Sequence, residues 1–232
     1  RALDLKALGI RYYRRLPDRF NCQFITRYPK PELLQKLGCL PEYGYTNAAW
    51  APLELFCDGQ ALTPARWPNT GYAFIDQVTD NGEGFAHANT RGGTFEQPSL
   101  KEKLKLWAQA DEVILHGYFY RDYFCYSTRV AIDPETARVT LGHGLLDGAH
   151  KPHQRFYAHH LPEELDLPGE WYLKRETGML YVWPPEGAGT LMIPVLETAA
   201  VQFDKVSHVT VHGFGIEGGR GRRQAAVCRL LQ

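Results

Sequence analysis

A hairpin pattern within residues 155–185 constrains the fold of this chain more than any other feature. Apolar side chains alternate with polar or aromatic ones over residues 170–174, and the alternation returns over residues 179–183. The turn between the two runs ends at Gly178, and glycine adopts the left-handed conformation without steric cost. Two prolines follow the second run and end it, because proline cannot donate to a strand ladder. We therefore expect an antiparallel hairpin here.

Shorter strand patterns accompany the hairpin. Residues 53–57 lead into Asp58 and Gly59, a pair that favours a tight primed turn, and residues 61–63 can return antiparallel. Further strand-like runs lie at residues 112–120, 124–132 and 137–141. Their connections are too short to cross over between parallel strands. The sequence therefore predicts a mainly β chain with an antiparallel domain, sandwich-like or barrel-like, and one or two short helices.

The best helix signal covers residues 99–109. Ser99 stands at the N-cap position with Glu102 three residues later, the spacing of a capping box. Apolar residues recur on one face at helical spacing, which predicts an amphipathic helix. A second short helix is predicted over residues 31–38, with proline at its start and glycine at its end. The glycine-rich and asparagine-rich residues 79–98 are expected to form a loop.

The last part of the chain, residues 195–232, has a different pattern. Very short apolar runs at residues 200–203, 208–212 and 214–219 are separated by one or two turn residues, with glycine at the corners. This pattern is typical of the coils of a parallel β-helix. One coil cannot bury its own apolar face, so we expect a truncated first coil whose stack continues outside this chain.

Charge and hydropathy argue against two classes of partner. Lys plus Arg and Asp plus Glu both number 26, which leaves no basic footprint for nucleic acid or for an anionic membrane surface. The chain also contains no run of 18 apolar residues that could span a bilayer. We therefore expect neither a nucleic-acid partner nor a membrane.

Cysteines and histidines give no metal or cofactor signal. The five cysteines include no CxxC pair and are odd in number, which argues against a disulfide framework or a zinc knuckle. His150 and His153 have HxxH spacing, but a proline lies between them. His208 and His212 would share a face only on an unbroken strand. Since a zinc site needs three or four converging ligands, we expect no metal, and no phosphate-cradling loop indicates another cofactor.

Aromatic residues make up 12 % of the chain, which suits a β-sheet core and also suits stacking against sugar rings. Arg66 beside Trp67 can form a cation-stacked platform, although a buried Trp with a partly buried arginine stem is the more common arrangement. Trp171, Tyr181 and Trp183 of the predicted hairpin are further candidates for binding. The alternation places Trp171 and Trp183 in opposite registers, so the exposed one is the first candidate for ligand contact.

Carboxylates are the candidates for glycosidic bond cleavage, which commonly uses two of them. Glu163, Glu164 and Asp166 are clustered, but their sequence context predicts one helical turn on the surface. Glu217 ends a short predicted strand and precedes two glycines, so it can stand at a coil corner beside a cleft. A solvated corner residue is the more common role, and Glu217 is the one weak catalytic candidate.

Three blocks of the sequence carry a resemblance: LELFCDGQALTPARWPNTGY (53–72), the block from DEVILHGYF (111–119) through RFYAHHLPEELDLPGEWYLKRETGMLYVWPP (155–185), and VSHVTVHGFGIEGG (206–219). Together they resemble the N-terminal part of bacterial right-handed parallel β-helix proteins related to glycoside hydrolases, including fucosidase-like, xylanase-like and β-xylosidase-like members. In such proteins an antiparallel β-domain interrupts the early coils, and the catalytic carboxylates lie on later coils. The resemblance, which begins near Leu53, therefore implies an inserted β-domain at 53–194 and the first coil at 195–232. Residues 1–52 are left as a separate, poorly defined N-terminal segment.

The same resemblance implies a carbohydrate partner. The chain, which begins at Arg1, is expected to be a piece of a secreted or periplasmic glycoside hydrolase that acts on a plant or microbial polysaccharide or oligosaccharide. No catalytic residue of the family maps onto it, so we expect the chain to be inactive by itself. Two alternatives stay open: a non-catalytic carbohydrate-binding module and a purely structural β-domain.

Overall fold

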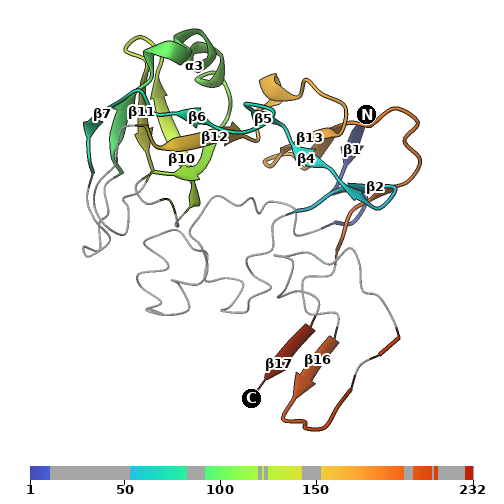
Figure 1. Ribbon diagram of the computed structural model, residues 1–232. Helices are drawn as coiled ribbons and strands as arrows, with labels where there is room; N and C mark the ends of the chain where they lie inside the picture. The colour runs from blue at the N-terminus through green and yellow to red at the C-terminus, as the bar shows by residue number, and fades with distance from the viewer. Residues whose placement is uncertain are drawn as a thin grey trace. The chain divides into compact units, whose positions relative to one another are not determined.

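The chain divides into two compact units in the computed structural model (Figure 1). The described residues are 1–10, 53–82, 92–119, 122, 125–142, 153–195, 201–210, 212–213 and 228–231. Unit 1 comprises Arg1–Pro17, Glu42–Thr63 and Pro168–Gln232, and unit 2 comprises Asp18–Pro41 and Pro64–Leu167. Within the described residues the chain is mainly β with antiparallel sheets and one short α-helix, which confirms the predicted class at this level.

The predicted hairpin forms in unit 1. Strands β13 (Glu170–Lys174) and β14 (Met179–Trp183) pair antiparallel, with Trp171 opposite Val182. The turn closes as expected at Gly178, which has a φ of 83° and donates its N–H to the carbonyl of Lys174 at 2.8 Å. Local alternation and one glycine were therefore sufficient to predict this element.

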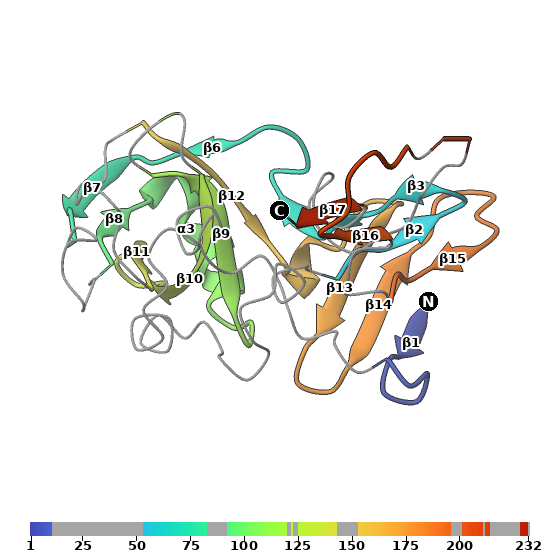
Figure 2. The same ribbon diagram turned by 90° about the horizontal axis from the view of Figure 1, so that it is seen from below.

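Two further strands extend the hairpin into a four-stranded sheet. Strand β1 (Ala2–Asp4) pairs with β14, and β4 (Thr63–Pro64) lies beside β13. Figure 2 shows β1, β14 and β13 side by side. Leu3 stands opposite Leu180, and Leu5 just beyond β1 is fully buried. The leucines that begin the chain thus cover the apolar side of the hairpin.

A small three-stranded sheet completes the core of unit 1. Strands β2 (Phe56–Cys57) and β3 (Gln60–Ala61) flank Asp58 and Gly59, whose φ values of 48° and 78° confirm the predicted primed turn. Strand β15 (Leu191–Met192) pairs with β2. The carboxylate of Asp58 accepts the backbone N–H groups of residues 189 and 190 at 2.9 and 2.8 Å, which fastens the turn to the segment before β15.

Unit 2 is built on one eight-stranded antiparallel sheet, ordered β5-β12-β9-β10-β11-β8-β7, with β6 also pairing to β12. Its strands are β5 (Arg66–Trp67), β6 (Ala73–Phe74), β7 (Gln77–Asp80), β8 (Thr94–Glu96), β9 (Val113–Tyr118), β10 (Tyr126–Asp133), β11 (Arg138–Leu141) and β12 (Arg155–His159). The helix α3 (Lys101–Trp107) contacts β10.

The core of unit 2 lies between α3 and the sheet. Leu104 and Trp107 are buried from the helix side, as the helical spacing predicted. Phe95 of β8 and Phe156 of β12 are buried from the sheet side, with ring centroids 5.7 Å apart. Consequently β8 and β12, far apart in sequence, contribute to one hydrophobic core.

The helix begins later than the capping pattern predicted. A 3₁₀ turn, η3 (Pro98–Leu100), precedes α3, and Ser99 makes no side-chain cap. Instead the backbone N–H of Ser99 donates to the Asp76 carboxylate at 3.1 Å. Glu102 pairs with Lys105 at 2.8 Å rather than reaching back to an N-cap. The predicted capping box was wrong because Asp76, distant in sequence, holds this turn.

The stretch predicted as a loop at residues 79–98 contains strand residues at both ends. Strand β7 ends at Asp80, and β8 pairs with both β7 and β11. Each of the two strands has four residues or fewer, so glycine and asparagine between them dominated the sequence pattern. The loop prediction was wrong here because pairing between distant strands, not local composition, defines β7 and β8.

One pair of strands near the end of the chain is parallel. Strands β16 (Val201–Asp204) and β17 (Cys228–Leu231) pair with Val201 opposite Cys228. The strand predicted at 208–212 is not formed in its described part, because His208 has a φ of 59°, in the left-handed region. The predicted helix at 31–38 and the predicted run at 214–219 lie outside the described residues.

Candidate functional site

The two tryptophans of the hairpin have opposite environments. Trp171 is 1 % exposed and Trp183 is 47 % exposed. The indole N–H of Trp171 donates to the carbonyl of Leu62 at 3.4 Å, so even its polar atom has a partner inside unit 1. Trp171 is therefore a core residue, and Trp183 is the tryptophan of the hairpin that can contact a ligand.

Trp183 belongs to a row of aromatic side chains on the outward face of the hairpin. Tyr181, two residues before it on β14, shares its face because side chains alternate along a strand, and it is 38 % exposed. The buried Tyr172 of β13 stands opposite Tyr181, and their rings stack with centroids 6.1 Å apart and planes inclined by 24°. We call Tyr172, Tyr181 and Trp183 the hairpin aromatic face.

A buried carboxylate and a small side chain flank this face. The register places Glu170 opposite Trp183, so a carboxylate and an indole lie side by side on the same side of the sheet. On the neighbouring strand β1, Ala2 stands opposite Tyr181, and its small side chain does not cover the Tyr181 ring. The two exposed rings are therefore the part of this face that a ligand can reach.

Arg66 does not form a platform with Trp67. The two are consecutive residues of β5, so their side chains leave the strand on opposite sides. The guanidinium of Arg66 lies 3.8 Å from the centroid of the Tyr157 ring. Its Nε donates to the carbonyl of Pro68 at 2.9 Å, and its Nη2 donates to the carbonyl of Gly71 at 2.6 Å. Arg66 therefore fixes the chain between β5 and β6.

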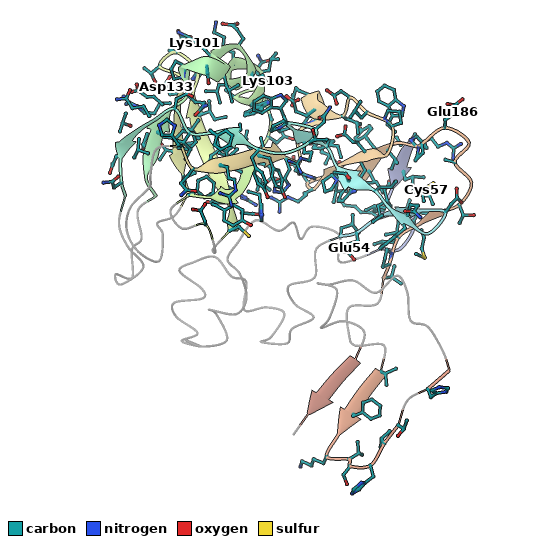
Figure 3. All side chains as sticks on the ribbon, in the orientation of Figure 1. Glu54, Cys57, Lys101, Lys103, Asp133 and Glu186 are labelled. Atoms are coloured by element: carbon teal, nitrogen blue, oxygen red, sulfur yellow. The ribbon has the colours of Figure 1, made fainter. Side chains whose placement is uncertain are left out.

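Trp67 packs on the helix side of unit 2. Its ring meets that of Trp107 edge-on, with centroids 5.6 Å apart. The ammonium of Lys103, which is labelled on α3 in Figure 3, lies 5.2 Å from the same ring. The half-buried Trp67 thus takes the arrangement that is more common for tryptophan, packing against the helix.

Glu164 has a different environment from the one predicted. The 3₁₀ turn η4 (Pro162–Glu164) forms, but Glu164 is buried rather than on the surface. Both of its carboxylate oxygens accept from Lys103, at 2.7 and 2.8 Å, and one also accepts the indole N–H of Trp107 at 2.8 Å. The buried indole N–H of Trp107 requires an acceptor. Glu164 supplies it, although it lies 57 residues away in the sequence.

The other candidates give no assembled site. Glu217 and His150 lie outside the described residues, while His153, His208 and His212 are exposed. Among the residues that the structure describes, no three His, Cys, Asp or Glu side chains gather closely enough to hold a metal ion. In the same part of the chain, no helix has the length and hydropathy needed to cross a membrane.

Comparisons with known proteins give one distant likeness to report. No family model matches the chain. No curated protein matches it. A solved structure described as "Glycoside hydrolase" aligns with a TM-score of 0.42 and 14 % identity, covering 64 % of this chain and 27 % of that one. This chain therefore spans about a quarter of that protein's length, and a likeness this distant does not establish a shared activity.

Proposed function

We propose that this chain is the sugar-binding part of a larger carbohydrate-active protein, and that its hairpin aromatic face stacks on sugar rings. One observation carries the proposal: Tyr181 and Trp183 are exposed next to each other on the same face of a paired strand. Soluble domains seldom leave neighbouring large aromatic rings in water without a use for them.

The geometry suits a sugar. The faces of pyranose rings carry C–H groups that pack on aromatic rings, and their edges carry hydroxyl groups. The backbone positions of Tyr181 and Trp183 are about 6.6 Å apart along the strand, because each residue of a strand adds about 3.3 Å. This spacing is comparable to the length of one sugar unit. Stacking on Tyr172 holds Tyr181 in place, so little side-chain entropy is lost on binding.

The larger protein is proposed to be a right-handed parallel β-helix protein of the glycoside hydrolase type. The sequence blocks support this assignment, and so does the parallel pair β16–β17, whose four paired positions share one offset of 27 residues, 228 minus 201. An offset of this size fits one coil of a solenoid. In this proposal the bond-cleaving carboxylates lie on later coils, so the chain binds sugar without cleaving it.

Calorimetric titration with a panel of neutral plant and host glycans tests the proposal. We expect heat of binding with at least one glycan, and binding about tenfold weaker after Trp183→Ala, because the loss of one stacking ring is worth about 1.4 kcal/mol. Met192→Ala, which removes another exposed apolar side chain of unit 1, is the matched control and should bind like the parent chain. Absence of heat with every glycan, or equal binding by Trp183→Ala, would refute the proposal.

A further inference from the structure

Unit 2 carries a second pair of exposed aromatic rings. Tyr72 is 37 % exposed and Phe74 is 57 % exposed. Phe74 stands opposite Arg155 in the β6–β12 pair, and Arg155 stands opposite Tyr118 in the β12–β9 pair. Directly opposed residues of antiparallel strands share a face, so these side chains lie on one side of the sheet.

Arg155 is held rigidly at the centre of this group. Its Nη1 donates to a carboxylate oxygen of Asp122 at 2.5 Å. Its guanidinium carbon lies 4.0 Å from the centroid of Tyr118 and 5.8 Å from that of Tyr72. The rings of Tyr72 and Tyr118 meet edge-on, with centroids 6.1 Å apart. An arginine fixed in this way loses little freedom when a ligand binds.

The charges of this group favour a neutral ligand over an anion. Asp122 is mostly in water, with 72 % of its side chain exposed, and its carboxylate already neutralises Arg155. An incoming anion would therefore meet a carboxylate beside the arginine. The pair instead offers an acceptor and a donor side by side, since a carboxylate has four lone-pair sites and a guanidinium has five N–H groups.

A vicinal diol matches this pair of groups. One hydroxyl donates to the Asp122 carboxylate while its neighbour accepts from the Arg155 guanidinium, and the C–H face of the same sugar packs on Tyr72 or Phe74. Leu106 of α3 is also half exposed and follows the ion pair of Glu102 and Lys105, but its aliphatic side chain offers no ring for the C–H face of a sugar. The convergence of rings with a fixed ion pair distinguishes this surface from an ordinary exposed side chain.

We infer that Tyr72, Phe74, Asp122 and Arg155, which we call the Tyr72 surface, form a second carbohydrate site that binds a neutral sugar through a vicinal diol. All four residues belong to unit 2, whereas the hairpin aromatic face belongs to unit 1. The inference shares its ligand class with the proposed function but rests on different residues, and each can fail without the other.

Titrations with soluble xylan, galactomannan and β-glucan test the inference. They are carried out on the parent chain and on the Trp183→Ala background, in which the hairpin contribution is removed. Each glycan is also tested after periodate oxidation, which cleaves vicinal diols, and polygalacturonate serves as an anionic comparison. Tyr72→Ala and Asp122→Ala probe the site. Leu106→Ala is the control for removal of an exposed apolar side chain from the same unit.

In the Trp183→Ala background we expect one neutral glycan to bind, with about tenfold weaker binding after either site substitution and no change after Leu106→Ala. Periodate oxidation should abolish this binding, and polygalacturonate should bind more weakly. The inference is overturned if Trp183→Ala alone removes all binding, if neither site substitution weakens it, if oxidised glycan binds equally, or if polygalacturonate binds more tightly. If both site substitutions remove binding and Trp183→Ala does not, the inference stands and the hairpin proposal fails.

Discussion

Trp171 and Trp183 belong to paired strands of one hairpin, yet they lie on opposite faces of it. The register places Trp171 opposite Val182, one residue before Trp183, and successive side chains of a strand point to opposite sides. One indole is therefore packed in the core of unit 1 and the other is in water.

Removal of each indole should consequently have a different effect on stability. Trp171→Ala should lower the free energy of unfolding by about 3–5 kcal/mol, because it leaves a large cavity and an unpaired carbonyl at Leu62. Trp183→Ala should lower it by less than about 1 kcal/mol. Urea unfolding followed by far-UV circular dichroism measures both. Equal losses in the two variants would contradict the assigned faces.

Glu164 should contribute more to stability than its neighbour Glu163. Glu164→Gln removes the charge that holds Lys103 and should cost about 2–3 kcal/mol, below the full value for a buried pair because Lys103 is about one-third exposed. Glu163→Gln, on the same turn but exposed, should change the free energy by less than about 0.5 kcal/mol. Thermal or urea unfolding of both variants provides the comparison, and similar values for the two would argue against the buried network.

Gly117 should not tolerate a side chain. A Cβ at this position of β9 would overlap the backbone carbonyl oxygen of Arg155 and lie 2.8 Å from the Cα of Phe156, so the two strands would have to separate. Gly117→Ala should cost about 3 kcal/mol. The control Gly187→Ala adds a Cβ in open space at a φ of 72° and should cost about 1 kcal/mol. A harmless Gly117→Ala variant in the same unfolding assay would contradict the close approach of β9 and β12.

Asp58 should make the unfolding stability depend on pH in the acid range. The backbone N–H groups of Gly189 and Thr190 hold the pKa of this carboxyl below its ordinary value of 3.8. Since the folded-state pKa is lower than the unfolded-state pKa, the stabilisation is present above pH 3.8 and is lost as pH falls through the depressed value. Asp58→Asn, which tolerates the left-handed φ, should remove this part of the acid dependence. If the free energy of unfolding falls with pH equally in the parent chain and in Asp58→Asn, this role of Asp58 is excluded.

The elements that the sequence predicted well have local causes. The hairpin follows from alternation around Gly178, and the primed turn follows from Asp58 and Gly59, because the signal and the structure lie within a few residues. The exposure of Trp183 also follows from the alternation, once the buried side of the hairpin is known.

The features that the sequence did not predict depend on distant partners. Glu164 is buried because Trp107 and Lys103 require its carboxylate, and neither lies near it in sequence. The Tyr72 surface exists because β6 and β9 both pair with β12, a strand for which we found no separate sequence signal. Patterns within one segment cannot reveal which side chains another segment brings beside them.

The most direct test of the central claim observes the two indoles of the hairpin in one NMR titration with the neutral glycan panel. The indole N–H of Trp171, which is hydrogen-bonded to the carbonyl of Leu62 inside unit 1, serves as an internal reference. We predict a saturable shift of the Trp183 indole resonance with at least one glycan, while the Trp171 resonance stays in place. A Trp183 resonance that does not respond to any glycan would contradict the claim that the hairpin aromatic face binds sugar.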